Sequence, residues 1–341
     1  MQKADAVFEG GGAKGIGLIG ALQAFEEAGF QWQNLAGTSA GAITAALVAV
    51  GYPAAEIWRI METRVEFPRF KDTWGVGKLP GVGPWINLIF NQGMYKGDYF
   101  LKLMRQLLSE KLQKDRVTFG DLIMPKELGD SDEAYERSYK YKLRVIASDI
   151  SGSGMLVLPQ DIKKLGMEPD ELEVALAIRM SMSIPFFFKP VRFGEGHPPQ
   201  ADRREHWIMD GGILSNFPIW LFDAPPGQTP PWPTIGFLLW EPGASTPRYQ
   251  KIGGLFTMIR AVADTLVGAI DRKALEEEEA GVTRIVKIPT GAVSTTDFDL
   301  TADARAELYS NGYHAAKEFL ESWSFDRYVE HRASQTAGGK T

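Results

Sequence analysis

The sequence predicts one α/β domain in which a mostly parallel sheet lies between layers of helices. Short apolar segments at residues 4–9 and 31–36 alternate with helical patterns at 16–28 and 40–50, and this strand–helix order is typical of the start of a parallel sheet. Glycine-rich turns separate each of these strands from the helix that follows it. Apolar residues make up 44% of the 341 residues, which is enough material for a large core.

The remaining elements extend this pattern across residues 1–330, which we expect to form a single domain without internal repeats. Another helix opens at Pro53, and further helices are expected at 98–112, 169–182, 252–280 and 302–323. Further strands are expected at 141–150, 154–158, 207–210, 235–241 and 283–289. Residues 66–97 are rich in Gly, Pro and aromatic residues, which indicates an irregular loop or lid. Residues 331–341 are expected to be a disordered tail.

Composition excludes several classes of protein. A formal net charge of -6 argues against nucleic-acid binding. The absence of cysteine excludes disulfides, cysteine nucleophiles and thiolate metal sites, and it fits a reducing cytoplasm. No stretch approaches the roughly 18–20 apolar residues of a spanning helix, and the N-terminus lacks the apolar region of a signal peptide. We therefore expect a cytoplasmic protein whose membrane contact, if it has one, is peripheral.

A serine lies at the centre of a G-x-S-x-G motif that comprises Gly37, Ser39 and Gly41. In this motif the serine occupies a sharp, strained turn between a strand and a helix, and the glycines avoid the clashes that a Cβ atom would cause. The N-terminus of the following helix directs N–H groups and positive dipole toward charge that develops nearby. The alternative is a chance turn, and the strongly apolar helix after Ser39 favours the catalytic interpretation.

A second glycine-rich loop, Gly10–Gly15, connects the first strand to the first helix. Its consecutive N–H groups can bind an anion and can form an oxyanion hole for Ser39. The spacing of Gly10, Gly12 and Gly15 also fits a dinucleotide-binding fingerprint, but no acidic residue follows in residues 31–41 to bind a ribose. A P-loop is excluded because Gly15, and not Ser or Thr, follows Lys14.

The base that activates Ser39 is expected to be Asp210, which ends a short strand and precedes Gly211 and Gly212. Partial burial raises the pKa of a carboxyl group, and a hydrogen bond from the serine can guide the proton. The alternative is that Asp-Gly-Gly forms a simple turn. A histidine base is not favoured, because none of the four histidines has a motif-like setting and all are interpreted as solvated surface residues: His197, His206, His314 and His331.

Taken together, these motifs resemble the bacterial patatin-like phospholipase family, whose members use a Ser-Asp dyad. The resemblance covers about residues 5–325 and rests on the Gly10–Gly15 loop, the Gly37–Gly41 turn, the sequence SMSIPFFFKP at 181–190, and Asp210-Gly211-Gly212 followed by Asn216 and Pro218. Residues 147–149 (ASD) and 93–97 (GMYKG) also fit the family. Met180, where the family often has alanine, is a small departure. The resemblance implies a three-layer α/β/α fold, Ser39 as nucleophile, Asp210 as base, and oxyanion donors among the N–H groups of Gly10, Gly11, Gly12 and Ala40.

The expected activity is therefore hydrolysis of acyl esters of phospholipids or lysophospholipids through an acyl-enzyme, without cofactor or metal. Apolar residues in the 66–97 segment are open to three interpretations, namely an acyl groove, a bilayer contact or ordinary core: Trp85, Ile86, Leu88, Ile89, Phe90 and Met94. Two other classes of function stay open. One is a lipid-binding or signalling module whose esterase activity is low or regulated, and the weaker one is a nucleotide-binding oxidoreductase. The oligomeric state does not follow from the sequence.

Overall fold

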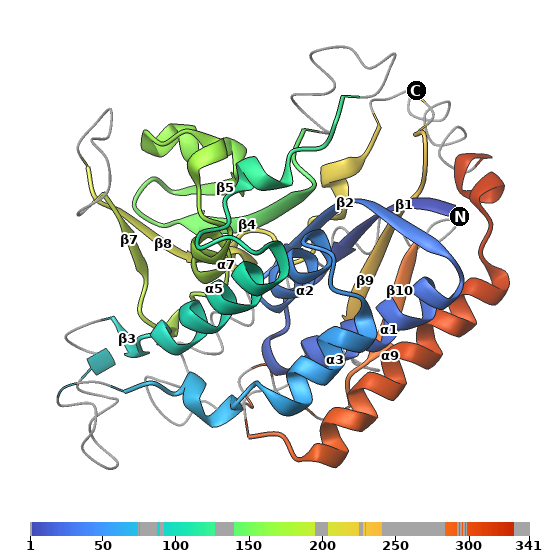
Figure 1. The fold of residues 1–341 in the computed structure, drawn as a ribbon, viewed down its shortest axis with the longest axis horizontal. Coiled ribbons are helices and arrows are strands. Elements are labelled where there is room, and N and C mark those ends of the chain that lie inside the picture. Colours follow the sequence, from blue (N-terminus) through green and yellow to red (C-terminus); the bar gives the residue numbers. More distant parts are fainter. Residues whose placement is uncertain are drawn as a thin grey trace, which may run out of the picture.

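The computed structural model describes most of the chain (Figure 1). The described residues are 2–73, 75, 87–88, 92–126, 140–194, 204–224, 228, 230–240, 284–291, 293, 295, 297 and 299–330. The expected helix at 252–280 and the expected tail at 331–341 lie outside the described residues.

A mixed sheet of eight strands forms the centre of the described part of the chain. Seven of the strands lie side by side in the order β10-β9-β1-β2-β4-β8-β7, and the eighth, β5, pairs with β4. The run from β10 to β4 is parallel throughout, whereas β5, β8 and β7 join by antiparallel pairs. The sheet is therefore mostly parallel, as the sequence predicts. Its strands are β1 (Gln2–Phe8), β2 (Phe30–Thr38), β4 (Leu143–Asp149), β5 (Gly154–Leu158), β7 (Val191–Phe193), β8 (His206–Asp210), β9 (Thr234–Trp240) and β10 (Ile285–Pro289).

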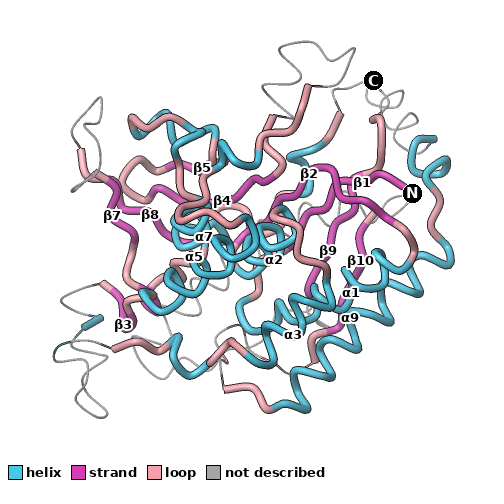
Figure 2. Tube along the Cα trace, in the orientation of Figure 1, coloured by secondary structure: helices cyan, strands magenta, loops and turns pink. Residues whose placement is uncertain are grey.

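Helices flank the sheet, as Figure 2 shows. The α-helices whose two ends both lie within the described residues are α1 (Ile16–Glu27), α2 (Ala40–Ala49), α3 (Ala54–Thr63), α5 (Asp98–Leu112), α7 (Val174–Ser181) and α9 (Ala302–Ser322). Successive side chains of a strand face opposite sides of a sheet, so neighbouring residues enter different cores. Phe8 and Leu35 belong to a large cluster beside α1 and α2, whereas Val7 and Ala36 belong to a smaller cluster with Phe217.

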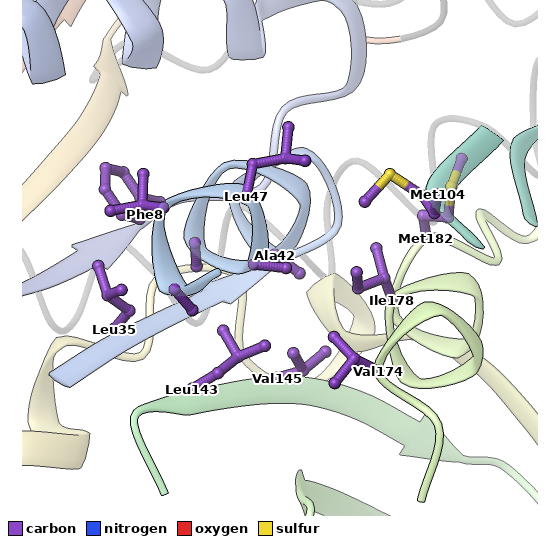
Figure 3. Packing of buried hydrophobic residues seen from close by; sticks show 14 of the residues in the cluster. Phe8, Leu35, Ala42, Leu47, Met104, Leu143, Val145, Val174, Ile178 and Met182 are labelled. Carbon is purple, nitrogen blue, oxygen red and sulfur yellow. The ribbon is translucent and has the colours of Figure 1, made fainter. Parts of the chain in front are cut away.

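Helix α2 is buried on nearly all sides, which agrees with its almost entirely apolar sequence. Figure 3 shows Ala42 and Leu47 of this helix among side chains of the neighbouring strands, such as Leu35 and Leu143, and of α7, such as Ile178. Packing on several sides leaves a helix one orientation. The first residue of α2, next to Ser39, is therefore held in a fixed position at the end of β2.

One expected helix is shorter than predicted. Residues 169–182 form a 3₁₀ turn at Pro169–Glu171, and α7 begins only at Val174. The interruption has a tertiary cause, because the backbone of Glu173 is extended and bridges to Thr118. The Glu173 carboxylate also accepts two hydrogen bonds from Arg105, at 2.6 and 2.7 Å.

The described parts of the 66–97 segment have more structure than an irregular loop. Phe67 and Phe70 lie in a buried 3₁₀ turn, and β3 (Gly93–Tyr95) pairs in parallel with β6 (Phe186–Phe188). Met94 is buried and Leu88 packs against the core, so these two side chains follow the core interpretation. Trp85, Ile86, Ile89 and Phe90 lie outside the described residues.

Candidate active site

Ser39 occupies a strained turn between β2 and α2. Its φ of 52° and ψ of -120° lie in a region that residues with a Cβ atom rarely adopt. Both motif glycines are needed for close packing, because a Cβ atom at Gly37 would lie 2.3 Å from the carbonyl carbon of Gly41, and one at Gly41 would lie 2.2 Å from the carbonyl oxygen of Phe8. The turn thus has the geometry that the G-x-S-x-G motif predicts, with the side chain of Ser39 at the start of α2.

The glycine-rich loop lies against this turn. A Cβ atom at Gly15 would approach the Cβ atom of Ala40 to 2.8 Å, so only glycine allows the loop to pack against the start of α2. Gly12 has a φ of 54°, and a Cβ atom there would lie 2.0 Å from the carbonyl oxygen of Thr295. The N–H group of Gly10 donates to the carbonyl oxygen of Asn216 at 3.1 Å. Gly10 is therefore engaged in holding the loop, which leaves Gly11, Gly12 and Ala40 as the expected donors to an anion.

Asp210 lies at the end of β8, opposite Ala147 of β4. Its Oδ1 atom accepts a hydrogen bond from the N–H group of Gly212 at 2.8 Å. Its Oδ2 atom is buried and has no hydrogen-bond partner within 3.5 Å among the described residues. Burial raises the pKa of the Asp210 carboxyl from 3.8 to about 7, while the Gly212 N–H and the nearby Ser39 hydroxyl act in the opposite direction.

Asn216 connects the Asp210 turn to the glycine-rich loop. Its Nδ2 atom donates to the carbonyl oxygen of Gly10 at 2.9 Å and to Oε1 of Glu9 at 3.1 Å. A Cβ atom at Gly212 would lie 2.9 Å from Oδ1 of Asn216, and one at Gly211 would lie 2.3 Å from a backbone oxygen of β4. The two glycines therefore let the turn after Asp210 pack closely against both the sheet and Asn216.

An apolar pocket with a cavity volume of about 60 Å³ opens beside Ser39. It runs between α1, α2 and α3 and is closed by the 3₁₀ turn that contains Phe67 and Phe70. Gly12, Ser39 and Ala40 contribute the polar backbone and hydroxyl groups at one side. The other lining residues are almost all apolar, including Ile16, Ile19, Ile43, Leu47, Ile57, Met61, Met182 and Ile184. The sequence alone does not predict this pocket, because its walls come from five separate segments.

Two of the four histidines, His206 and His314, lie within the described residues. His206 is buried at the start of β8, and its Nδ1 atom is 2.6 Å from Oδ2 of Asp149. The interpretation of His206 as a solvated surface residue is therefore wrong, because pairing to a strand-end carboxylate holds it inside. His314 is exposed on α9, and His197 and His331 lie outside the described residues. The described residues contain no group of three or more His, Asp or Glu side chains arranged to hold a metal ion.

Fold and site together define an α/β protein with a serine on a strained turn, a buried carboxyl beside it and an apolar pocket at the serine. Residues 6–223 match the family model described as patatin-like phospholipase. The chain therefore belongs to the patatin-like phospholipase family, whose activity is lipid acyl hydrolysis. This membership gives no support to the nucleotide-binding oxidoreductase alternative.

Two curated relatives are similar in sequence. The uncharacterized protein YqhO of Bacillus subtilis (strain 168) is 35% identical over 322 residues, which cover 94% of this chain and 99% of YqhO. The uncharacterized protein R571 of Acanthamoeba polyphaga mimivirus is 25% identical over 225 residues, which cover 65% of this chain and 62% of R571.

Solved structures share the fold at low sequence identity. VipD from Legionella pneumophila has a TM-score of 0.54 and 19% identity, with coverage of 94% of this chain and 67% of VipD. A second match is full-length ExoU in its complex with SpcU, from the type III secretion system of Pseudomonas aeruginosa. Its TM-score is 0.50 at 18% identity, and the match covers 93% of this chain and 52% of ExoU.

No helix in the described part of the chain combines the length and the apolarity needed to cross a bilayer.

Proposed function

We propose that this protein hydrolyses acyl esters of phospholipids or lysophospholipids with Ser39 as nucleophile and Asp210 as general base. The observation that carries the proposal is the setting of the two side chains: a serine on a strained turn at an apolar pocket faces a buried carboxyl whose pKa is about 7. Such a pKa lets the carboxyl be ionised near neutral pH while it remains basic enough to accept a proton.

In the proposed reaction, Oγ of Ser39 attacks the ester carbonyl carbon while its proton passes to the Asp210 carboxylate. The N–H groups of Gly11, Gly12 and Ala40 stabilise the negative charge on the carbonyl oxygen of the tetrahedral intermediate. Collapse of this intermediate expels the alcohol, which takes the proton from Asp210 and leaves an acyl group on Ser39. Water then attacks the acyl-enzyme, Asp210 accepts a proton from it, and this proton returns to Oγ of Ser39 as the fatty acid leaves.

The pocket supports an acyl chain as the part of the substrate that is bound. Ser39, Ile43 and Leu47 are spaced four residues apart on one face of α2, so the pocket follows the helix away from the nucleophile for about 12 Å, at 1.5 Å per residue. Burial of apolar surface contributes about 0.8 kcal/mol per CH₂ group. A chain of several methylene groups therefore binds far better in this pocket than an acetyl group does.

The direct test is hydrolysis of a nitrophenyl butyrate by wild type and by Ser39→Ala, followed by mass spectrometry of the products from a panel of phospholipids and lysophospholipids. Ser39→Ala should reduce kcat by orders of magnitude and leave the melting temperature close to that of wild type. Ser148→Ala is the matched control, because Ser148 is fully buried and lies on β4, and its hydroxyl has no partner within the described residues. Retention of more than about a tenth of the wild-type rate by Ser39→Ala would overturn the nucleophile assignment.

A variant that narrows the pocket tests the substrate class. Ile43→Phe should lower kcat/KM for a nitrophenyl decanoate at least tenfold relative to the acetate, because the added ring atoms occupy space along the path of the chain. An equal loss on both esters would show that the acyl chain does not enter this pocket.

A further inference from the structure

The last turn of α7 and the residues that follow it contact the backbone of both proposed catalytic residues. Oγ of Ser181 accepts a hydrogen bond from the N–H group of Ser39 at 2.9 Å. The carbonyl oxygen of Ser183 accepts one from the N–H group of Asp210 at 3.0 Å. Ser181 and Ser183 are completely buried, so water does not replace either contact. Two residues that are far apart in the sequence thus bind to acceptors only two residues apart.

Arg179 holds this segment in place. One of its terminal nitrogens donates to Oγ of Ser183 at 2.6 Å, and the Ser183 hydroxyl donates back to the carbonyl oxygen of Arg179 at 2.8 Å. The other terminal nitrogen donates to the carbonyl oxygens of Lys96 and Lys189, at 2.5 and 2.8 Å. These bonds join the end of α7 to the chain beside β3 and β6. The segment is therefore a rigid support for the two turns that it contacts.

The N–H group of Ser39 needs this support because of the backbone conformation that it belongs to. A non-glycine residue at a φ of 52° is strained and persists only when its surroundings hold it. Ser181 provides the side-chain acceptor for that N–H group, and the same peptide unit fixes where the Ser39 side chain leaves the turn.

We propose that Ser181 is a positioning residue that keeps Ser39 in its reactive conformation through the hydrogen bond from the Ser39 N–H group. Ser181 touches neither the substrate nor the reacting atoms in this assignment. The inference rests on the proposed function, since it concerns the reactivity of the same nucleophile. Without the acceptor, the turn relaxes away from its strained angles, and Oγ of Ser39 spends less time aligned with Asp210 and the expected oxyanion donors.

The experiment compares Ser181→Ala with Ser148→Ala in the full-length protein. Both changes remove one hydroxyl from a fully buried serine, but only Ser181 contacts Ser39. Ser148 pairs with Met209 and Asp210 pairs with Ala147, so Ser148 and Asp210 point to opposite faces of the sheet. The measurements are kcat and KM for a nitrophenyl butyrate, the rate at which a fluorophosphonate probe labels Ser39, the pH profile and the melting temperature.

Ser181→Ala should lower kcat and the labelling rate about tenfold, which corresponds to one buried hydrogen bond. KM should stay within about twofold of wild type, because the pocket walls are untouched. The apparent pKa of the acidic limb should not move, because the Ser183 carbonyl still accepts the Asp210 N–H. Ser148→Ala should match wild type in kcat and labelling. A purely structural role of Ser181 predicts a lower melting temperature with unchanged kcat in the folded fraction, and that result would overturn the inference.

Ser181→Cys provides a second variant in case the alanine change prevents folding. Its thiol fills similar space but is a weaker acceptor, so kcat should fall by a smaller factor while the melting temperature stays near that of wild type. Full kcat in Ser181→Cys would also overturn the inference. If wild type itself shows no Ser39-dependent hydrolysis and no labelling, the proposed function fails and the inference fails with it. If wild type is active and Ser181→Ala equals Ser148→Ala, only the inference fails.

Discussion

Replacement of Asp210 by asparagine should inactivate the enzyme and at the same time stabilise the fold at alkaline pH. Asparagine keeps the shape of the side chain and an oxygen that accepts the Gly212 N–H, so the turn after β8 is preserved. It has no carboxylate to accept the proton of Ser39, which removes the proposed base. It also removes a buried group whose ionisation is unfavourable, because burial is the main cause of the raised pKa of Asp210.

The expected stabilisation follows from the raised pKa of about 7 in the folded protein against 3.8 for the ordinary group. In the folded state the carboxyl keeps its proton over a pH range in which the unfolded chain has already lost it. Stability is therefore greatest below the unfolded pKa and decreases as pH rises from about 4 to about 7. At about 1.36 kcal/mol per pKa unit, ionisation of Asp210 lowers the free energy of unfolding by about 2–3 kcal/mol between about pH 5 and about pH 8.

Urea unfolding of wild type and Asp210→Asn at about pH 5 and about pH 8 measures this difference directly. The advantage of the variant should be about 2–3 kcal/mol larger at the higher pH. In wild type, kcat/KM for a soluble ester should fall on the acidic side with an apparent pKa of about 7, because protonation removes the base. Equal pH dependence of stability in both proteins would refute the burial argument, and so would an acidic limb near pH 4.

Asp5 offers a matched control for the pH profile of activity. It is a second buried carboxyl whose pKa is raised to about 7, again mainly by burial, and it accepts hydrogen bonds from Asn34 and Trp232. It lies on β1, and its hydrogen-bond partners come from β2 and from the chain before β9. Asp5→Asn should leave the acidic limb of kcat/KM at its wild-type position. A shift of that limb would show that Asp210 is not the group that titrates.

Three further outcomes are expected. His206→Ala should lower the melting temperature, since it removes the histidine that pairs with the buried Asp149 carboxylate. It should reduce kcat far less than Asp210→Asn does. A histidine variant as inactive as Asp210→Asn would indicate a catalytic triad. Activity should survive EDTA, and a loss restored by calcium or zinc would reveal a metal requirement. Trp85→Ala combined with Phe90→Ala should weaken liposome binding and vesicle hydrolysis, because Trp favours bilayer interfaces. The rate of hydrolysis of a soluble ester should not change. Parallel losses on both substrates, together with a lower melting temperature, would instead indicate core packing.

The strand-to-helix turns of the site could be predicted from the sequence because their requirements are local. A Cβ atom at Gly37 would meet Gly41 of the same turn, and Gly12 has a positive φ within its own loop. Spacing along the sequence therefore indicates their geometry. The contacts that exclude a Cβ atom at Gly15 and Gly41 come from other segments. The sheet order could be predicted only in part, because the antiparallel pairing of β8 with β4 depends on contacts between distant segments.

Residues whose role depends on distant partners could not be found in this way. Ser181 is the first residue of the family-like stretch at 181–190, but nothing near it in the sequence indicates that it contacts Ser39. His206 looked like part of a polar surface loop, whereas its partner Asp149 lies on another strand. A serine or histidine among apolar residues at the end of an element is the one signal that points to such contacts, because a buried polar group needs a partner.

Several features of the site destabilise the fold, and their placement explains why the surrounding core is so tightly packed. Ser39 holds a strained backbone, Asp210 is ionised in a buried position above about pH 7, and Arg179 keeps its charge inside the protein with a pKa lowered to about 10 by burial. Strain and buried charge of this kind amount to roughly 1–4 kcal/mol at each position. The fully packed helix α2 and the short hydrogen bonds of the Arg179–Ser183 segment offset them. Removal of the buried charge of Asp210 should therefore raise stability and lower activity together, whereas substitutions in the core around α2 should lower both.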